Sequence, residues 1–320
     1  MLKLLLIPVL GLAPGIFWLW LIYRGDKYRP EPKRLVIRTF VLGMVAVIPV
    51  LFIEVLLFLP YLFSHLDDLK NFGVGVLNKL SLGEMAYISF IIAGFTEELF
   101  KFLVVRTTIY KSPYFDEPTD GLIYSSSAAL GFASLENVMY LFSYGWELIL
   151  VRAPISTLAH VVFSAMWGYP LALRKLNRQH SMLLLWLGLL GAMAGHGLFD
   201  FLAMAQDAYK SLNMPLLVGI IVLFAGMIAL FVFLLKRGQK TSPFKDQNAE
   251  LLILCSNCQS RIPYYASFCP VCGNRLIENR SVSPSFCGKC GSELSSGTNY
   301  CTSCGSRMIK KAGSINEHPQ

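Results

Sequence analysis

The sequence carries little charge for its length, and that scarcity excludes most classes of soluble protein. Asp, Glu, Lys and Arg make up 15% of the 320 residues, against roughly 25% in an ordinary soluble domain. Hydrophobic residues make up 54%. The composition therefore predicts an all-α, polytopic protein embedded in a lipid bilayer.

Cysteine is absent from the first 250 residues, and all eight cysteines follow that point in C-x-x-C pairs. Such pairs supply thiolates rather than disulfides, so we expect this region to lie in a reducing compartment. The pattern C-x2-C-x10-C-x2-C occurs twice, shifted by 32 residues, and consists of Cys255, Cys258, Cys269, Cys272, Cys287, Cys290, Cys301 and Cys304.

Each copy of the cysteine pattern is typical of a zinc ribbon. Two hairpin knuckles supply two sulfurs each, which completes the tetrahedron that Zn²⁺ prefers. A module of this size lacks a hydrophobic core, so we expect two structural Zn²⁺ sites. Redox pairs are the alternative, and the equally spaced tandem repeat disfavours them.

Seven apolar runs have about the 20 residues that a membrane-spanning helix needs. The runs cover residues 4–23, 35–59, 85–105, 121–144, 153–172, 183–205 and 216–235. The first run lacks an A-x-A cleavage signal, which favours a retained helix over a signal peptide. We therefore expect a transmembrane domain at 1–240, a linker at 241–252, ribbons at 253–274 and 285–306, and a polar tail at 307–320.

Basic residues cluster in alternate loops, in the segments RGDKYRPEPKR, RKLNR and KRGQK, whereas SHLDDLK and AQDAYK are mixed or acidic. Because basic loops stay on the cytoplasmic side, we expect a multi-pass protein of the cytoplasmic membrane. Its N-terminus would lie outside and its ribbons inside. These loops also account for the net charge of +8, so a nucleic-acid partner is not expected.

Ionisable side chains within apolar runs are costly to insert and mark functional sites. Glu97 and Glu98 adjoin in AGFTEELFKFLVV, and Lys101 follows one turn later, where it would neutralise one of the two carboxylates. The spacing does not decide which one. Four more polar residues lie at comparable depth in later runs, in the outer half of the bilayer: Glu136, His160, His196 and Asp200.

The surroundings of these residues suggest roles for some of them. His196 and Asp200 are four residues apart, so the carboxylate would orient the imidazole. Phe132, one turn before Glu136, is expected to pack. Glu54 lies in the second run without a motif around it, and we expect it to be structural or to line the site.

At these positions the sequence resembles the PrsW family of intramembrane proteases, relatives of the CAAX-prenyl proteases and bacteriocin-processing enzymes. EELFK matches the E-E-x-x-K signature, FASLE the F-x-x-x-E signature and HGLFD the H-x-x-x-D signature, in order between residues 90 and 205. The resemblance implies glutamate-dependent peptide hydrolysis in the membrane. The catalytic residues would be Glu97, Glu98, Glu136, His160, His196 and Asp200, with Lys101 and Phe132 supporting them.

The residue types fit a route in which Glu97 or Glu98 takes a proton from a water held with Glu136. The two histidines would stabilise the oxyanion or hold the water. Two glutamates and two histidines would also serve as ligands of a catalytic Zn²⁺. The absence of an H-E-x-x-H array favours the metal-free route, and no serine lies in a nucleophile elbow.

The leading function is cleavage of a membrane-anchored protein near its extracytoplasmic side. The family resemblance suggests an anti-sigma-factor-like regulator as substrate. A non-catalytic scaffold or sensor that recruits a cytosolic partner through the ribbons is a second hypothesis. A proton-coupled transporter is a third, since transporters also carry intramembrane Glu, His and Asp, although no internal repeat is visible.

Overall fold

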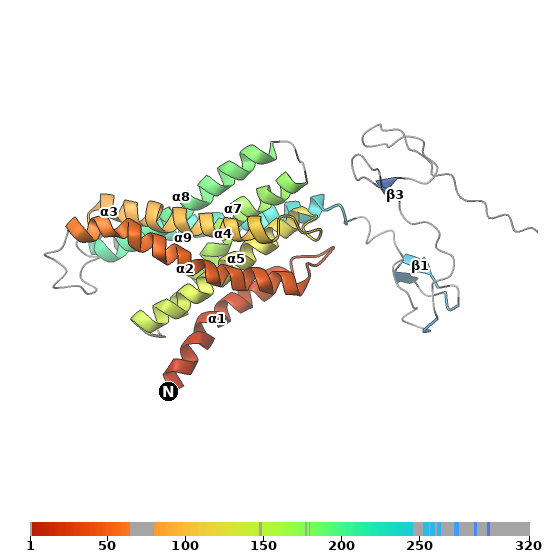
Figure 1. The fold of residues 1–320 in the computed structure, drawn as a ribbon, viewed down its shortest axis with the longest axis horizontal. Helices are drawn as coiled ribbons and strands as arrows, with labels where there is room; N and C mark the ends of the chain where they lie inside the picture. Colours follow the sequence, from red (N-terminus) through yellow and green to blue (C-terminus); the bar gives the residue numbers. More distant parts are fainter. Residues whose placement is uncertain are drawn as a thin grey trace, which may run out of the picture. The chain divides into compact units, whose positions relative to one another are not determined.

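The computed structural model describes most of the first 245 residues and short stretches of the C-terminal region. The described ranges are 2–64, 80–146, 149–176, 178, 180–245, 252–255, 257–259, 261–263, 272–274, 285–286 and 293–294. The chain splits into two compact units, Met1–Asn248 and Ala249–Gln320 (Figure 1).

The described part of the first unit is all-helical, as predicted, with seven helical segments at the positions of the seven apolar runs. Five are uninterrupted: α1 (Leu2–Tyr23), α2 (Lys33–Ser64), α5 (Pro118–Tyr144), α8 (Ser181–Ala208) and α9 (Asn213–Thr241), which the short η6 (Lys210–Leu212) precedes. Two are composite. One runs through α3 (Leu82–Ala86), η3 (Tyr87–Phe95) and α4 (Thr96–Thr108), the other through α6 (Ile149–Val151), η5 (Arg152–Ser156) and α7 (Thr157–Lys175).

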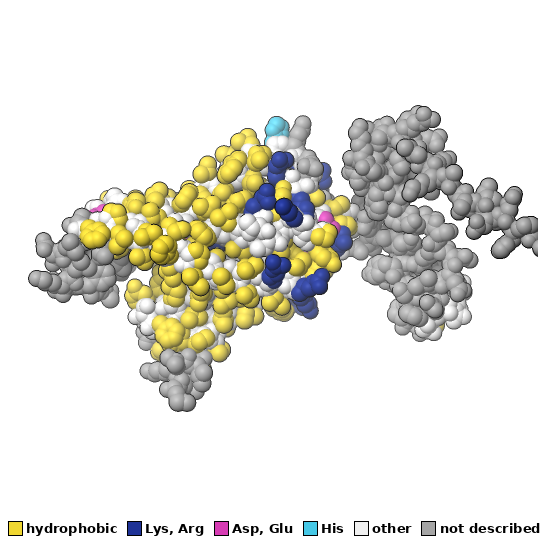
Figure 2. All heavy atoms as spheres, viewed as in Figure 1, with side chains coloured by type: hydrophobic (Ala, Val, Ile, Leu, Met, Phe, Trp, Pro, Cys, Tyr) yellow, Lys and Arg dark blue, Asp and Glu magenta, His cyan; other side chains and the backbone are white. Residues whose placement is uncertain are grey.

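Four of the described helices are long and apolar enough to cross a membrane. They cover Leu6–Tyr23, Lys33–Tyr61, Ser181–Gln206 and Lys210–Thr241. Their outward surface is hydrophobic, and Figure 2 shows Lys and Arg side chains gathered at one end of the helical unit. An apolar surface with basic residues at one end is the pattern expected of helices in a bilayer.

Helix α5 lies at the centre of the unit. Residues 118–134 are all buried, and the helix packs against α1, α2 and α7. A Cβ atom added to Gly131 would lie 1.9 Å from the carbonyl oxygen of Phe40, and one added to Gly121 would lie 2.1 Å from that of Gly168. Small residues thus allow backbone-to-backbone contact on both sides of α5, which fixes its position between α2 and α7.

The segments η3 and η5 are π-helical, a rare geometry that occurs frequently at functional sites. Each leads directly into a helix that carries polar residues of the intramembrane group. Glu97 lies in the first turn of α4 after η3, and His160 lies in the first turn of α7 after η5. The switch from i→i+5 to i→i+4 bonding therefore sets the face on which these side chains emerge.

The described part of the second unit contains two short hairpins. Strand β1 (Leu252–Leu254) pairs antiparallel with β2 (Arg261–Pro263), and β3 (Ser285–Phe286) pairs antiparallel with β4 (Glu293–Leu294). The turn between β1 and β2 carries Cys255 and Cys258. This is the hairpin knuckle that the cysteine spacing predicts for a zinc ribbon.

Candidate active site

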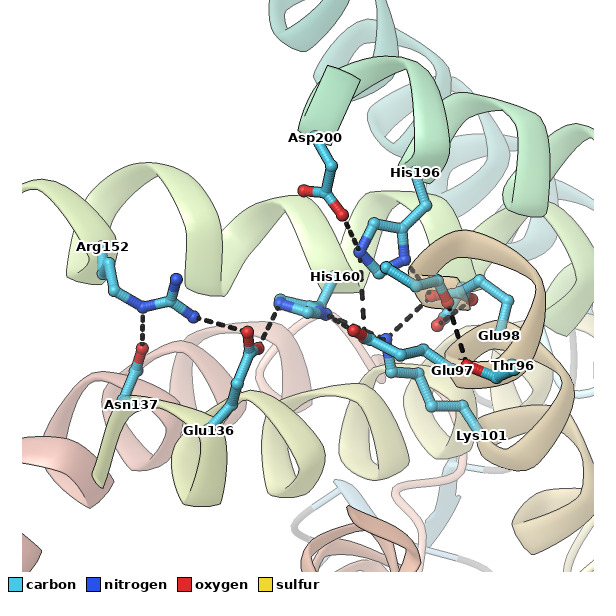
Figure 3. Close-up of polar contacts among 12 residues, drawn as sticks. Thr96, Glu97, Glu98, Lys101, Glu136, Asn137, Arg152, His160, His196 and Asp200 are labelled. Carbon is cyan, nitrogen blue, oxygen red and sulfur yellow. Dashed lines mark hydrogen bonds and ion pairs between the residues drawn. The ribbon is translucent and has the colours of Figure 1, made fainter. Parts of the chain in front are cut away.

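Four helices bring the polar residues of the apolar runs together inside the helical unit, as Figure 3 shows. Helix α4 supplies three of them, α5 and α7 one each, and α8 two: Glu97, Glu98, Lys101, Glu136, His160, His196 and Asp200. The sequence motifs, up to 100 residues apart, thus converge on one place.

Lys101 is fully buried and pairs with both glutamates of α4. Its Nζ atom lies 2.9 Å from Oε2 of Glu97 and 2.9 Å from Oε1 of Glu98. The expectation that it pairs with only one of the two carboxylates was wrong, because residues at i−4 and i−3 share a helix face and an ammonium group has three donors. The third donor reaches Nδ1 of His160 at 2.9 Å.

Phe132 also contacts this lysine. The Lys101 Nζ atom lies 4.5 Å from the centre of the Phe132 ring, and the phenylalanine is buried. The expectation that Phe132 packs holds, but its ring face also interacts favourably with the buried ammonium.

Glu98 is fully buried and surrounded by donors. Its Oε2 atom accepts hydrogen bonds from the Ser164 hydroxyl at 2.8 Å and the Trp167 indole at 3.0 Å. Its Oε1 atom, already paired with Lys101, lies 3.2 Å from Nδ1 of His196. Because two donors face each of its oxygens, all four acceptor positions of this carboxylate are filled, and it is closed to an incoming water.

Glu97 faces a cavity of about 680 Å³ instead. The cavity is also lined by polar residues from α2, α5, α7 and α8: Glu54, Glu136, His160, His196 and Asp200. Glu54, expected to be structural or lining, lies on this wall, and its Oε1 atom accepts a hydrogen bond from Thr96 at 3.4 Å. Glu98 is not among the described residues that line the cavity.

His160 links Lys101 to Glu136. The lysine ammonium only donates, so Nδ1 of His160 accepts and the ring proton is assigned to Nε2. Nε2 lies 3.0 Å from Oε2 of Glu136. On the other side, Oε1 of Glu136 lies 3.1 Å from Nη2 of Arg152, whose Nε donates to Asn137 at 2.8 Å.

One ring nitrogen of His196 contacts Glu98, and the other faces the cavity residues Asp200 and Glu97. With Nδ1 at Glu98, Nε2 lies 3.5 Å from Oδ2 of Asp200 and 3.8 Å from Oε2 of Glu97. The ring stacks on Phe163 with centroids 5.3 Å apart. Both distances at Nε2 exceed ordinary hydrogen-bond length, so this nitrogen is available to a bound group.

Glu97, His160 and His196 are also the residue types of a His₂Glu zinc centre. Each places one ligand atom within 4.8 Å of the others. However, Lys101 donates to Glu97 Oε2 and to His160 Nδ1. A divalent ion bound at these two atoms would have to displace the buried ammonium, so at these atoms the arrangement fits a metal only if Lys101 moves.

The C-terminal cysteines do fit a metal. Cys255, Cys258 and Cys272 place their sulfurs within 4.8 Å of one another, and the Cys255 and Cys272 sulfurs lie 3.7 Å apart. Zn–S bonds of about 2.3 Å in a tetrahedron place sulfurs about 3.8 Å apart. The other predicted ligands lie outside the described residues: Cys269, Cys287, Cys290, Cys301 and Cys304.

Two residues of the site were not predicted from the sequence. Arg152 precedes the apolar run of His160 and was assigned no role, yet it is largely buried against Glu136 and its guanidinium lies 3.8 Å from the Tyr140 ring centre. Trp167 donates to Glu98, one turn beyond Ser164. A signal was available for Arg152, because it is a charged residue immediately before the run that carries His160.

Comparison with known proteins matches residues 31–234 to the family described as PrsW family intramembrane metalloprotease. Residues 255–305 match the double zinc ribbon family. The chain is 32% identical over 209 residues to "Protease PrsW" of Bacillus subtilis (strain 168), covering 65% of this chain and 87% of that relative. It is 32% identical over 229 residues to "Protease PrsW" of Clostridioides difficile (strain 630), covering 70% and 87%. No solved structure matches the chain.

Proposed function

Since the chain belongs to the PrsW family of intramembrane proteases, we propose that it hydrolyses a peptide bond of a membrane-anchored protein at the cavity beside Glu97. The observation that carries this proposal is the unequal placement of the two adjacent glutamates. Glu97 lines the cavity, whereas Glu98 is enclosed by donors. Only Glu97 is therefore placed to act on a water.

In the proposed reaction, the Glu97 carboxylate takes a proton from a water while the water oxygen attacks the scissile carbonyl carbon. The carbon–oxygen bond forms first. The carbon–nitrogen bond then breaks, and the proton held by Glu97 passes to the leaving amine. General base catalysis of this kind contributes about 10² to 10⁴ in rate, and Lys101 holds the carboxylate in place at 2.9 Å.

The negative charge that develops on the carbonyl oxygen needs a donor in a site that excludes water. We assign this role to the Nε2–H group of His196 in its imidazolium form, because Nδ1–H already donates to Glu98. The Asp200 carboxylate, 3.5 Å from Nε2, would stabilise that positive charge. His160 is a positioning residue, because both of its nitrogens already face Lys101 and Glu136. Glu136, on the cavity wall, holds the attacking water from the other side.

We propose that this route needs no catalytic metal, because Lys101 already donates to Oε2 of Glu97 and Nδ1 of His160, two of the atoms that an ion could use. The description of the matched family includes the word metalloprotease. If a divalent ion displaced Lys101, Glu97, His160 and His196 would hold it, and it would polarise the scissile carbonyl. The structural zinc belongs to the ribbons.

The surface supports an orientation in the cytoplasmic membrane. We propose seven spans, with the basic end in Figure 2 on the cytoplasmic side, the N-terminus outside and the ribbons inside. The ribbons would recruit a cytosolic protein partner rather than a nucleic acid. By analogy with the family, the substrate would be an anti-sigma-factor-like membrane regulator.

The proposal is tested by comparing the membrane proteomes of strains with the wild-type protein and with Glu97→Gln. We expect N-terminal fragments of at least one membrane protein to disappear in the variant while the intact protein accumulates. Glu84→Gln, outside the cavity, serves as the matched control. Identical fragments in all three strains would favour a scaffold, and proton flux in reconstituted vesicles would favour a transporter.

A further inference from the structure

A second group of buried carboxylates lies well away from the candidate active site. Asp26 and Glu31 belong to the loop between α1 and α2, and Glu117 and Asp120 lie at the start of α5. Their exposed fractions are 4%, 2%, 1% and 0%. Asp120 and Glu136 are 16 residues apart on one helix, which is about 24 Å at 1.5 Å per residue.

Three of these residues are close enough to share one ion. Asp26, Glu117 and Asp120 each place a carboxylate oxygen within 4.8 Å of the others. A cation with metal–oxygen distances of about 2.3 to 2.6 Å fits among ligand atoms at that spacing. The donors are all oxygens, which is the set that hard divalent cations prefer.

The two aspartates are held so that one oxygen of each has no partner. Oδ2 of Asp26 accepts from the backbone N–H of Glu31 at 2.7 Å. Oδ2 of Asp120 accepts from the N–H groups of Asp116 at 2.6 Å and Glu117 at 2.7 Å. Oδ1 of each aspartate is buried without a hydrogen-bond partner among the described residues. Amide donors favour the ionised carboxylate and offset part of the cost that burial imposes on its charge. A bound cation would offset the rest.

The side-chain hydrogen-bond donors to Glu31 and Glu117 are neutral hydroxyls, whereas Lys175 and Asp116 interact with the group electrostatically. Glu31 accepts a hydrogen bond from the Tyr124 hydroxyl, and Glu117 accepts from the hydroxyls of Thr119 and Ser242. In the described part of the chain, the nearby ion pair joins Arg29 to Asp116, whose side chains are 49% and 26% exposed. No described lysine or arginine pairs with the four buried carboxylates, and buried charge without a counter-ion is unfavourable.

We propose that Asp26, Glu117 and Asp120 form a binding site for a hard divalent cation, Ca²⁺, Mg²⁺ or Mn²⁺. The ion would join the α1–α2 loop to the start of α5. Through the Ser242–Glu117 hydrogen bond it would also hold the residue that follows α9. The site is independent of the proposed peptidase chemistry.

The test uses the full-length protein in detergent, dialysed into buffer without divalent cations. Separate titrations with CaCl₂, MgCl₂ and MnCl₂ are followed by the thermal unfolding midpoint, and Mn²⁺ binding by the loss of the free Mn²⁺ signal in electron paramagnetic resonance. We expect at least one of the cations to raise the midpoint and one Mn²⁺ to bind per chain. Asp26→Asn and Asp120→Asn should each weaken binding by at least about tenfold.

The thermal unfolding midpoint measured without added cation distinguishes a folding defect from a loss of cation binding. The Asn variants remove buried like charge, so they should unfold at or above the wild-type temperature without added cation, yet no longer respond to it. Glu117→Gln provides a third variant of the same kind. Glu97→Gln and Asp116→Asn should bind Mn²⁺ as the wild type does.

Two results would overturn the proposal. A wild-type midpoint insensitive to all three cations, with no Mn²⁺ bound, would mean that the four carboxylates hold only protons. Loss of the bound Mn²⁺ in Glu97→Gln, but not in Asp120→Asn, would place the ion in the intramembrane cavity. The second result would bear on the peptidase mechanism, and the first would leave that mechanism untouched.

Discussion

Glu97 and Glu98 are consecutive residues that contact the same ammonium group at 2.9 Å, yet only Glu97 reaches the cavity. Glu98 points into the contact between helices α4, α7 and α8, where Ser164, Trp167 and His196 surround it. Glu97 thus lies at the cavity, whereas Glu98 connects the three helices.

Replacing each glutamate separately should therefore have different effects. Glu97→Gln should reduce peptide cleavage by about 10² to 10⁴ with little change in the thermal unfolding midpoint. Glu98→Gln should lower the midpoint, because an amide cannot serve four donors as a carboxylate does. Cleavage rates and midpoints measured on both purified variants check this. An unchanged midpoint for Glu98→Gln would contradict it.

Lys101→Met should be strongly destabilising, by about 3 to 5 kcal/mol, because it leaves two buried carboxylates without their cation. The double variant Glu98→Gln, Lys101→Met should recover part of that loss, since it leaves a single charge. Lys111→Met, at an exposed position, is the control. Equal stability of the single and double variants would argue against the shared pairing.

Arg152→Gln should lower peptide cleavage by acting through Glu136, although the arginine itself also lines the cavity. The arginine lies 3.1 Å from Glu136, so its loss frees that carboxylate to move away from the cavity. We expect kcat to fall more than KM changes, and Arg152→Lys to restore part of the rate. Arg174→Gln, exposed at the end of α7, should have no effect.

If the reaction needs no catalytic metal, the zinc content per chain and the rate of peptide cleavage should respond to different changes. The His196→Ala variant should contain as much zinc per chain as the wild type, because the ribbons alone bind it. A chain lacking residues 246–320 should contain no zinc and should still cleave peptide in the presence of a chelator. Zinc retained by the shortened chain and lost in its His196→Ala form would require a catalytic metal.

Cation binding to the buried carboxylates should strengthen as pH rises from about 6 to 9. Burial raises the pKa of two proposed ligands, Asp26 to about 8 and Asp120 to about 10, and that of the neighbouring Glu31 to about 7, so the ion competes with protons at lower pH. Because these carboxyls bind protons more tightly when folded, the cation-free protein should lose stability as pH rises from about 4 to 10. Mn²⁺ titrations at several pH values measure how cation binding depends on pH. Asp26→Asn should reduce the pH dependence of both cation binding and cation-free stability.

The sequence was sufficient to predict the helices and the family. Hydrophobic runs mark the seven segments because burial in lipid leaves few polar residues within them. The family that the motifs around Glu97, Glu136 and His196 indicate is confirmed by the match over residues 31–234. The double zinc ribbon is confirmed in the same way. Four of the seven segments meet the length and hydropathy of a membrane span.

What could not be predicted depends on how helices rotate and pack. The π-helical segment before Glu97 changes the direction of the side chains that follow, and no hydropathy pattern records it. Trp167 can be recognised as a partner of Glu98 only once the contact between α4 and α7 is known. Asp26 and Glu31 lie in a loop whose basic residues were used only to predict membrane orientation. Their proximity to Asp120 was therefore not predicted.

The cavity beside Glu97 has a volume of about 680 Å³ and is lined by residues from several helices. A transmembrane helix with its side chains is about 10 to 12 Å wide, and its amide groups are hydrogen-bonded within the helix. A helical substrate of the proposed reaction would therefore have to unwind locally before its carbonyl reaches the carboxylate. We expect cleavage sites to lie near Gly or Pro residues, so that selectivity depends on how readily a substrate helix opens rather than on a pocket for one side chain.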